Sequence, residues 1–153
     1  MTNLRERFTG DLKEAMKAGE KGKVAAIRLV QAALKDKDIE ARGAGKGEAT
    51  PDEILALLQK MIKQRQESVE LYEKGGRAEL AAQEREEIAV ITAYLPQQMS
   101  EDETKAAIAA EIAELGAAGM KDMGKVIAAL KAKYAGQMDF GKASGLVKAA
   151  LNG

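Results

Sequence analysis

Apolar residues in the N-terminal part of the chain recur at the spacing of amphipathic helices. In residues 3–18, four of them follow one another at steps of four: Leu4, Phe8, Leu12 and Met16. This spacing predicts one helix with a continuous apolar stripe. A second apolar stripe runs from about residue 23 into the early forties, where Gly43, Gly45 and Gly47 predict its end. We therefore expect two helices joined by a short turn near Gly19.

The central part of the chain predicts two further helices and a joint. Thr50, Pro51 and Glu53 form a helix start, in which the threonine caps the helix and the glutamate completes a capping box. This third helix should run to about residue 74, and a fourth from about residue 78 to residue 95. Pro96 disfavours helical geometry at the preceding residue. The sequence thus predicts an N-terminal domain of residues 1–96 and a second domain of residues 97–153.

The second domain should contain three helices. Ser100 and Glu103 repeat the capping-box pattern and open a helix in which we expect three apolar side chains to be buried. These side chains are Ile108, Ile112 and Leu115. The last two helices should begin near Asp122 and Asp139, each capped by its aspartate. With 29 alanines and two prolines in 153 residues, the sequence predicts an all-α fold that ends in a three-helix bundle.

Composition removes several classes of function. The chain has no cysteine, histidine or tryptophan, which excludes Cys-His and Ser-His catalysis and the usual zinc sites. The longest uncharged stretch, residues 88–100, is shorter than the roughly 20 apolar residues of a membrane-spanning helix. No strand precedes a glycine-rich phosphate loop, so we expect no nucleotide cofactor. The absence of an export signal leads us to expect a cytoplasmic protein without a membrane partner.

Charge is balanced over the whole chain but segregated within the second domain. Lys and Arg together number 24, as do Asp and Glu. Residues 116–153, however, hold two aspartates and six lysines: Lys121, Lys125, Lys131, Lys133, Lys142 and Lys148. Phosphate contacts of a nucleic acid would use such lysines, since each contact releases counterions without reading a base. The alternative interpretation is an ordinary solvated surface.

The segment from Lys121 to Lys125 is the most informative part of this basic region. It reads Lys-Asp-Met-Gly-Lys, so two lysines flank a predicted helix start that contains Asp122, Met123 and Gly124. Unpaired N–H groups and the helix dipole favour an anion at such a place. The alternative is a plain helix cap in which the glycine permits close packing against a neighbour.

No group of residues in the sequence forms a catalytic constellation. The neighbouring carboxylates Glu101, Asp102 and Glu103 point to different sides of a helix and suit the positive end of its dipole. The tyrosines at 72, 94 and 134 are too far apart for a base-stacking surface, and we expect them at the edge of the core. We therefore assign no catalytic residue.

Four segments resemble the YqeY family over essentially the whole chain. They are LRERFTGDLKEAMKA at 4–18, AAIRLV at 25–30, AYLPQQMSEDE at 93–103 and DMGKVI at 122–127. The resemblance implies an N-terminal helical domain followed by a three-helix domain similar to the tail of GatB, a subunit of glutamine-dependent tRNA amidotransferase. One departure is the segment 136–140, Gly-Gln-Met-Asp-Phe, which lacks the small residue before the aspartate and the Gly or Pro after it.

The resemblance implies a tRNA-associated accessory protein. In the amidotransferase the tail touches tRNA, so the six lysines and the segment 121–125 become candidates for binding tRNA, while the N-terminal domain is free to recruit a protein partner. Two alternatives stay open. One is a helical interaction module without enzymatic or RNA function, and the other is the carbon–nitrogen ligase activity, with glutamine as amide donor, that the family label implies.

Overall fold

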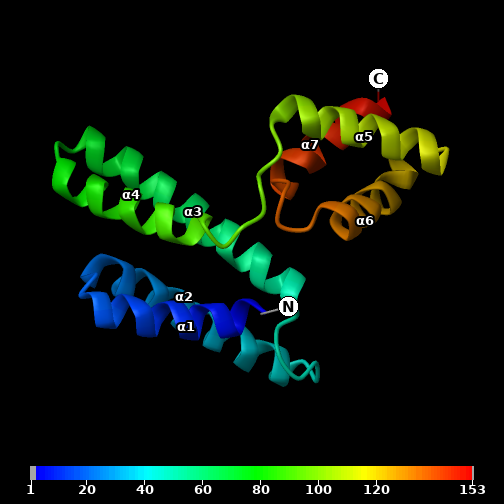
Figure 1. The fold of residues 1–153 in the computed structure, drawn as a ribbon. Coiled ribbons are helices and arrows are strands. Elements are labelled where there is room, and N and C mark those ends of the chain that lie inside the picture. The colour runs from blue at the N-terminus through cyan, green and yellow to red at the C-terminus, as the bar shows by residue number, and fades with distance from the viewer. Residues whose placement is uncertain (1–2, 153) are drawn as a thin grey trace. The chain divides into compact units, whose positions relative to one another are not determined.

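The chain is helical throughout the part that the structure describes. The computed structural model describes residues 3–152, and these contain no strand (Figure 1). The helices are α1 (Leu4–Ala18), α2 (Lys21–Gly43), α3 (Pro51–Lys74), α4 (Ala78–Thr92), α5 (Glu101–Leu115), the 3-10 turn η1 (Met120–Asp122), α6 (Met123–Tyr134) and α7 (Phe140–Asn152). The predicted all-α class is confirmed. Packing divides the chain into two compact units, Met1–Leu95 and Pro96–Gly153; that each unit folds on its own is still a prediction.

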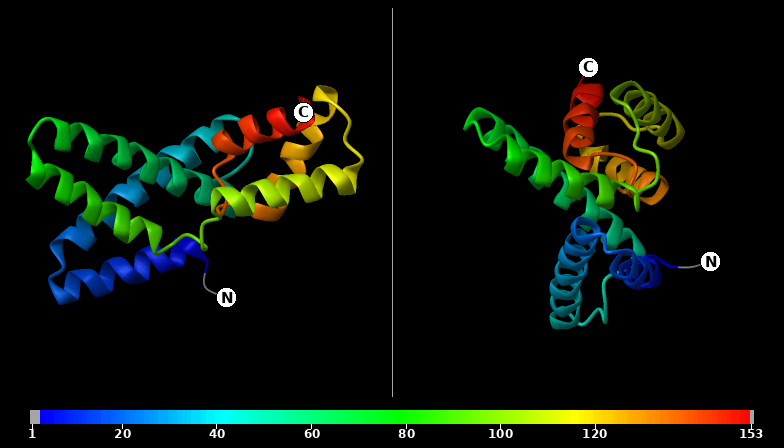
Figure 2. Two further views of the ribbon diagram at one scale, coloured as in Figure 1. Left: turned by 90° about the horizontal axis from the view of Figure 1, so that it is seen from above. Right: turned by 60° about the vertical axis from the view of Figure 1, so that its left-hand side comes forward.

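The first unit consists of two helical hairpins. Helix α1 lies beside α2, α3 lies beside α4, and α4 also packs on α2 (Figures 1 and 2). Each helix gives a fully buried side chain to the shared core: Phe8, Ile27, Leu58 and Ile91. Because these side chains come from all four helices, the core joins the two hairpins into one unit.

The predicted starts of α1 and α3 have their capping bonds in place. The Asn3 side chain accepts a hydrogen bond from the N–H of Glu6 at 2.8 Å. At α3, Thr50 and Glu53 each accept the other's backbone N–H at 3.1 Å, which is the predicted capping box. Helix α2 starts at Lys21, two residues before the predicted position, and α4 ends at Thr92, three residues before it.

The predicted stripe of α1 is wrong at its last position. Phe8 is buried, but Met16 is 54% exposed, and Ala15 is buried in its place. Steps of four residues advance about 40° beyond a full turn each, so a four-residue pattern winds around the helix. Ala15 lies seven residues after Phe8, nearly two whole turns, and therefore stays on the core side.

Tyr94 is a core residue of the first unit rather than an edge residue. Its ring packs edge-on against Phe8, with 4.8 Å between ring centroids, and its hydroxyl donates to the Asp11 carboxylate at 2.5 Å. Burial raises the pKa of the Tyr94 hydroxyl well above its usual range, so the hydroxyl stays a donor. This contact fastens the end of the first unit, two residues before Pro96, to α1.

The second unit is a three-helix arrangement around its own core. The buried side chains include Ile108 on α5, Val126 and Leu130 on α6, and Val147 on α7. Ser100 and Glu103 form the predicted capping box at the start of α5. Leu115, which we expected to be buried, is 45% exposed, because it is the last residue of α5 before the turn at Gly116.

Gln98 and Met99, just after Pro96, form hydrogen bonds to a later segment of the second unit. The Gln98 side chain donates to the carbonyl of Gly136 at 2.6 Å, and the Met99 N–H donates to the carbonyl of Gln137 at 2.8 Å. Met138, which follows, is fully buried. The divergent segment 136–140 therefore has a structural role: its carbonyl groups bind residues 98 and 99 at the start of the second unit, and Met138 contributes to the core.

Candidate nucleic-acid interface

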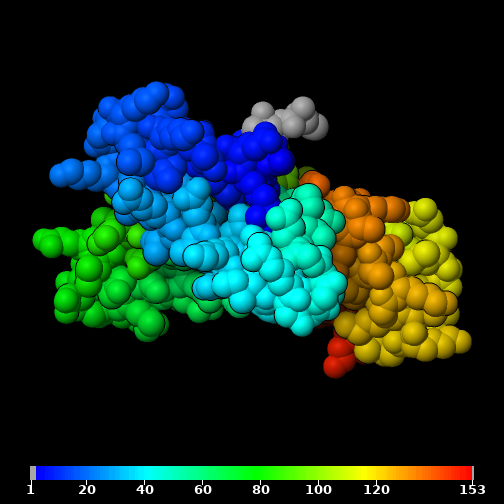
Figure 3. Space-filling model, turned by 90° about the horizontal axis from the view of Figure 1, so that it is seen from below, coloured from blue at the N-terminus to red at the C-terminus, as the bar shows by residue number. Residues whose placement is uncertain are grey.

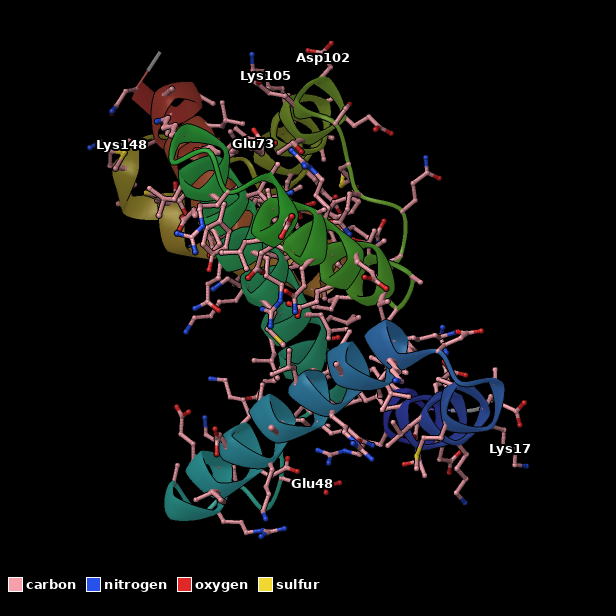
Figure 4. All side chains as sticks on the ribbon, turned by 90° about the vertical axis from the view of Figure 1, so that its left-hand side faces the viewer. Lys17, Glu48, Glu73, Asp102, Lys105 and Lys148 are labelled. Atoms are coloured by element: carbon pink, nitrogen blue, oxygen red, sulfur yellow. The ribbon has the colours of Figure 1, made fainter. Side chains whose placement is uncertain are left out.

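All six lysines of the predicted interface lie on α6, α7 and the turn η1, and all are exposed. Figure 4 labels Lys148 on α7. They do not form one stripe. Lys125 and Lys131 are six residues apart on α6, as are Lys142 and Lys148 on α7, and six residues rotate a helix by about 240°. The structure therefore spreads these charges over more than one face.

Lys133 is held by carboxylates of α5. Its ammonium group donates to Glu111 at 2.8 Å and to Glu114 at 3.0 Å, and the Glu111 side chain is only 5% exposed. The hydrogen bond to Glu111 is the main cause that raises the pKa of Lys133. Because two carboxylates already surround this ammonium group, Lys133 is the candidate with the least charge available for a phosphate.

The start of α6 differs from the predicted aspartate cap. Asp122 ends the 3-10 turn, and its side chain makes no capping bond to α6. Its carboxylate instead accepts the backbone N–H of Ala118 at 2.9 Å and so closes the turn that follows α5. The prediction that Asp122 caps the helix is wrong. At the next helix the prediction is confirmed, since Asp139 accepts the N–H groups of Gly141 and Lys142.

Gly124 does not serve close packing. It is exposed, and no heavy atom of another described part of the chain lies within 4 Å of where its Cβ would be. The close-packing alternative is therefore wrong, and Gly124 itself is open to solvent. Met123, by contrast, is half-buried and packs against the core of the second unit.

The two lysines beside this helix start are exposed and make at most a long ion pair with the described residues. Lys125 is 77% exposed, and its ammonium group lies 3.9 Å from the Asp122 carboxylate. For Lys121, which is exposed in η1, the described residues include no ion-pair partner. Exposed pairs at such distances contribute little free energy, so both lysines can reorient toward an anion. The site can hold a phosphate, and it brings together no nucleophile, base or metal ligand set: the described residues contain no group of three His, Cys, Asp or Glu side chains suited to a metal ion.

Comparison with known proteins decides the family. A family model described as Yqey-like protein matches residues 5–151, nearly the whole chain. The chain belongs to the YqeY family. None of the helices within residues 3–152 is both long enough and apolar enough to cross a membrane.

Curated relatives match a smaller part of this YqeY protein. The altered inheritance of mitochondria protein 41 of Vanderwaltozyma polyspora is 35% identical over 85 residues, which cover 56% of this chain and 44% of the relative. The protein of the same name in Saccharomyces cerevisiae is 34% identical over 88 residues, covering 58% of this chain and 46% of the relative. The matched segments thus span less than half of each relative. Their names refer to mitochondria, whereas we expected a cytoplasmic protein.

Proposed function

We propose that this YqeY protein is a tRNA-associated accessory protein, related to the glutamine-dependent tRNA amidotransferase, whose second unit binds tRNA through phosphate contacts. The proposal rests on the family, on the similarity to the GatB tail that the sequence resemblance implies for the second domain, and on the excess of lysine over acid in residues 116–153. No catalytic role is assigned to any residue. The location that suits this partner is the cytoplasm, which subcellular fractionation would test.

The start of α6 is the observation that carries the proposal. Gly124 is exposed with no side chain near it, and the exposed Lys121 and Lys125 lie on either side of it in the sequence. The helix dipole and two ammonium groups favour an anion there, while the N–H of Met123 donates to Met120 and the Asp122 carboxylate accepts from Ala118. An RNA phosphate can approach closely because no side chain stands at position 124.

The remaining lysines extend this surface unequally. Lys131, Lys142 and Lys148 are exposed, and the described residues give them no ion-pair partner. Lys133 is engaged by α5 and contributes least. We therefore assign the main phosphate contact to Lys121 and Lys125, with the three other exposed lysines adding weaker attraction that does not depend on RNA sequence.

The test compares tRNA binding of two charge-matched double variants across a series of salt concentrations. Replacing Lys121 and Lys125 with Gln should weaken binding and make the slope of log affinity against log salt shallower by roughly 0.7 to 0.9 for each phosphate that is no longer neutralised. The matched control replaces Lys13 and Lys17 of α1, also exposed lysines, with Gln. Equal affinity of the two variants at every salt concentration would contradict the assignment of the site.

A further inference from the structure

The first unit carries a groove between α1 and α2 that the proposed RNA site does not use. It encloses about 410 Å³. Its apolar lining comes from the buried Phe8 and Leu34 and from the exposed Ile39, and its cationic lining from Arg5, Lys35 and Arg42. Figure 3 shows the α1 and α2 surfaces lying against each other.

Two of the three cations along the groove have no partner of their own. The Arg5 guanidinium is engaged by both oxygens of Asp38, at 2.8 and 2.7 Å. Lys35 and Arg42 are exposed, and within residues 3–152 their side chains make no hydrogen bond or ion pair. Arg5 is thus paired with Asp38 and also lies 3.7 Å from the exposed Glu48, so Lys35 and Arg42 are the lining cations without an ion-pair partner among the described residues.

An apolar side chain lies between these free cations along the helix. Ile39 is 55% exposed and lies four residues after Lys35 and three residues before Arg42, so all three share one face of α2. The groove residues of α2 extend from Gln31 to Arg42, which is roughly 16 Å of helix, or about three turns. An exposed isoleucine with a cation on either side of it along the helix suits an amphipathic helix that carries both apolar and acidic side chains.

We infer that this groove binds an acidic amphipathic helix of a protein partner, with an apolar side chain on Ile39 and carboxylates against Lys35 and Arg42. RNA fits less well, because its phosphates would leave Ile39 uncovered, and Phe8, the aromatic residue of the lining, is 1% exposed and offers no face for stacking. The groove belongs to the first unit, so its occupancy and tRNA binding by the second unit can be measured separately.

The experiment titrates the full chain with two designed 18-residue helical peptides, followed by amide chemical shifts in NMR. Both peptides carry leucines at positions i, i+3, i+7 and i+10; one has glutamate and the other lysine beside the leucines. The wild-type chain should bind the glutamate peptide, with the largest shifts on α1 and α2. Ile39→Ser should weaken that binding, since it removes apolar contact at an exposed position.

Charge reversal gives the decisive comparison. The double variant Lys35→Glu, Arg42→Glu should bind the glutamate peptide about 5- to 30-fold more weakly, the change expected from two exposed ion pairs, and should gain affinity for the lysine peptide. The matched control, Lys13→Glu with Lys17→Glu, makes the same charge change on α1 outside the groove and should keep the wild-type preference (Lys17 in Figure 4). Circular dichroism of each variant confirms that it is folded.

Three outcomes would overturn the inference. The first is a glutamate peptide that produces no saturable shifts on α1 and α2 of the folded wild-type chain. The second is single-stranded RNA that shifts these groove resonances when the peptide does not. The third is a chain that self-associates in sedimentation and no longer does so in the charge-reversed variant, because the groove would then bind a second copy. Loss of tRNA binding with intact peptide binding would count against the proposed function alone.

Discussion

Asp38 shows how a single residue joins distant parts of the first unit. It accepts two hydrogen bonds from Arg5, 33 residues away, and one from the backbone N–H of Ala49 at 2.9 Å. The hydrogen bond to Arg5 is the main cause that lowers the pKa of Asp38 from 3.8 to about 2. The carboxylate therefore ties the start of α1 and the loop before α3 to the last turns of α2.

We expect Asp38→Asn to lower the free energy of unfolding at pH 7 by about 2 kcal/mol, because a pKa difference of one unit is about 1.4 kcal/mol. The folded pKa lies below the unfolded one, so this contribution is complete above about pH 4 and is lost as the pH falls through about 2. Urea unfolding at a series of pH values measures it. Asp36→Asn, an exposed neighbour, is the control; equal destabilisation of both variants, or a difference that persists at pH 2, would contradict this account.

The ion pairs between distant helices could not be predicted from the sequence. Glu111 and Lys133 are 22 residues apart, and Arg5 and Asp38 are 33 apart. Periodicity assigns a charged residue to the solvent side of its own helix, but it contains no information about which other helix comes to lie there. For that reason Lys133 belonged to the predicted phosphate site on charge alone, and only tertiary packing shows that α5 engages it.

At the scale of the helices, the sequence predicts which segments are helical better than which side chains are buried. Capping boxes at Thr50 and Ser100 are local, so their geometry follows from four consecutive residues. Met16 and Leu115 were expected in the core and are exposed. A four-residue stripe winds around its helix, and periodicity does not tell where along the helix the neighbouring helices end.

The capping box of α5 gives a prediction at this scale. Ser100→Ala removes the acceptor of the Glu103 N–H and should lower the free energy of unfolding by about 1 kcal/mol. The control is Ser68→Ala in α3, where the hydroxyl only donates to the carbonyl of Gln64 and alanine is the better helix former. Thermal unfolding followed by circular dichroism measures both. A Ser100→Ala protein that is no less stable than Ser68→Ala would show that the capping bond contributes nothing.

The geometry of the candidate site depends on the 3-10 turn before α6, which the sequence motif does not predict. The segment 121–125 was predicted as a capped helix start, but Asp122 closes the preceding turn, and Gly124 faces open space. The sequence places two lysines beside this helix start, and both are exposed in the structure; that they bind phosphate stays a prediction. It could not predict the direction of the Asp122 carboxylate, because the 3-10 turn that directs it toward Ala118 depends on the path of the chain after α5.

For the whole molecule, the two compact units allow binding to different partners to be proposed for each unit separately. The first unit is held together by its own core and by the contact of Tyr94 with Asp11, and the second by its own core and by the contacts of Gln98 and Met99. The change from one unit to the other is confined to residues 95–97. The partners that we propose are therefore divided between the units: tRNA for the second and an acidic helix for the first.

The most direct test of the tRNA proposal is the affinity of residues 97–153 alone for tRNA, measured beside the full chain at two salt concentrations. We predict a folded helical fragment by circular dichroism that binds within about threefold of the full chain and shows the same dependence on salt, because the proposed phosphate contacts all lie in the second unit. A folded fragment that does not bind tRNA, while the full chain does, would contradict the assignment of RNA binding to this unit. An unfolded fragment would contradict the domain boundary at Pro96.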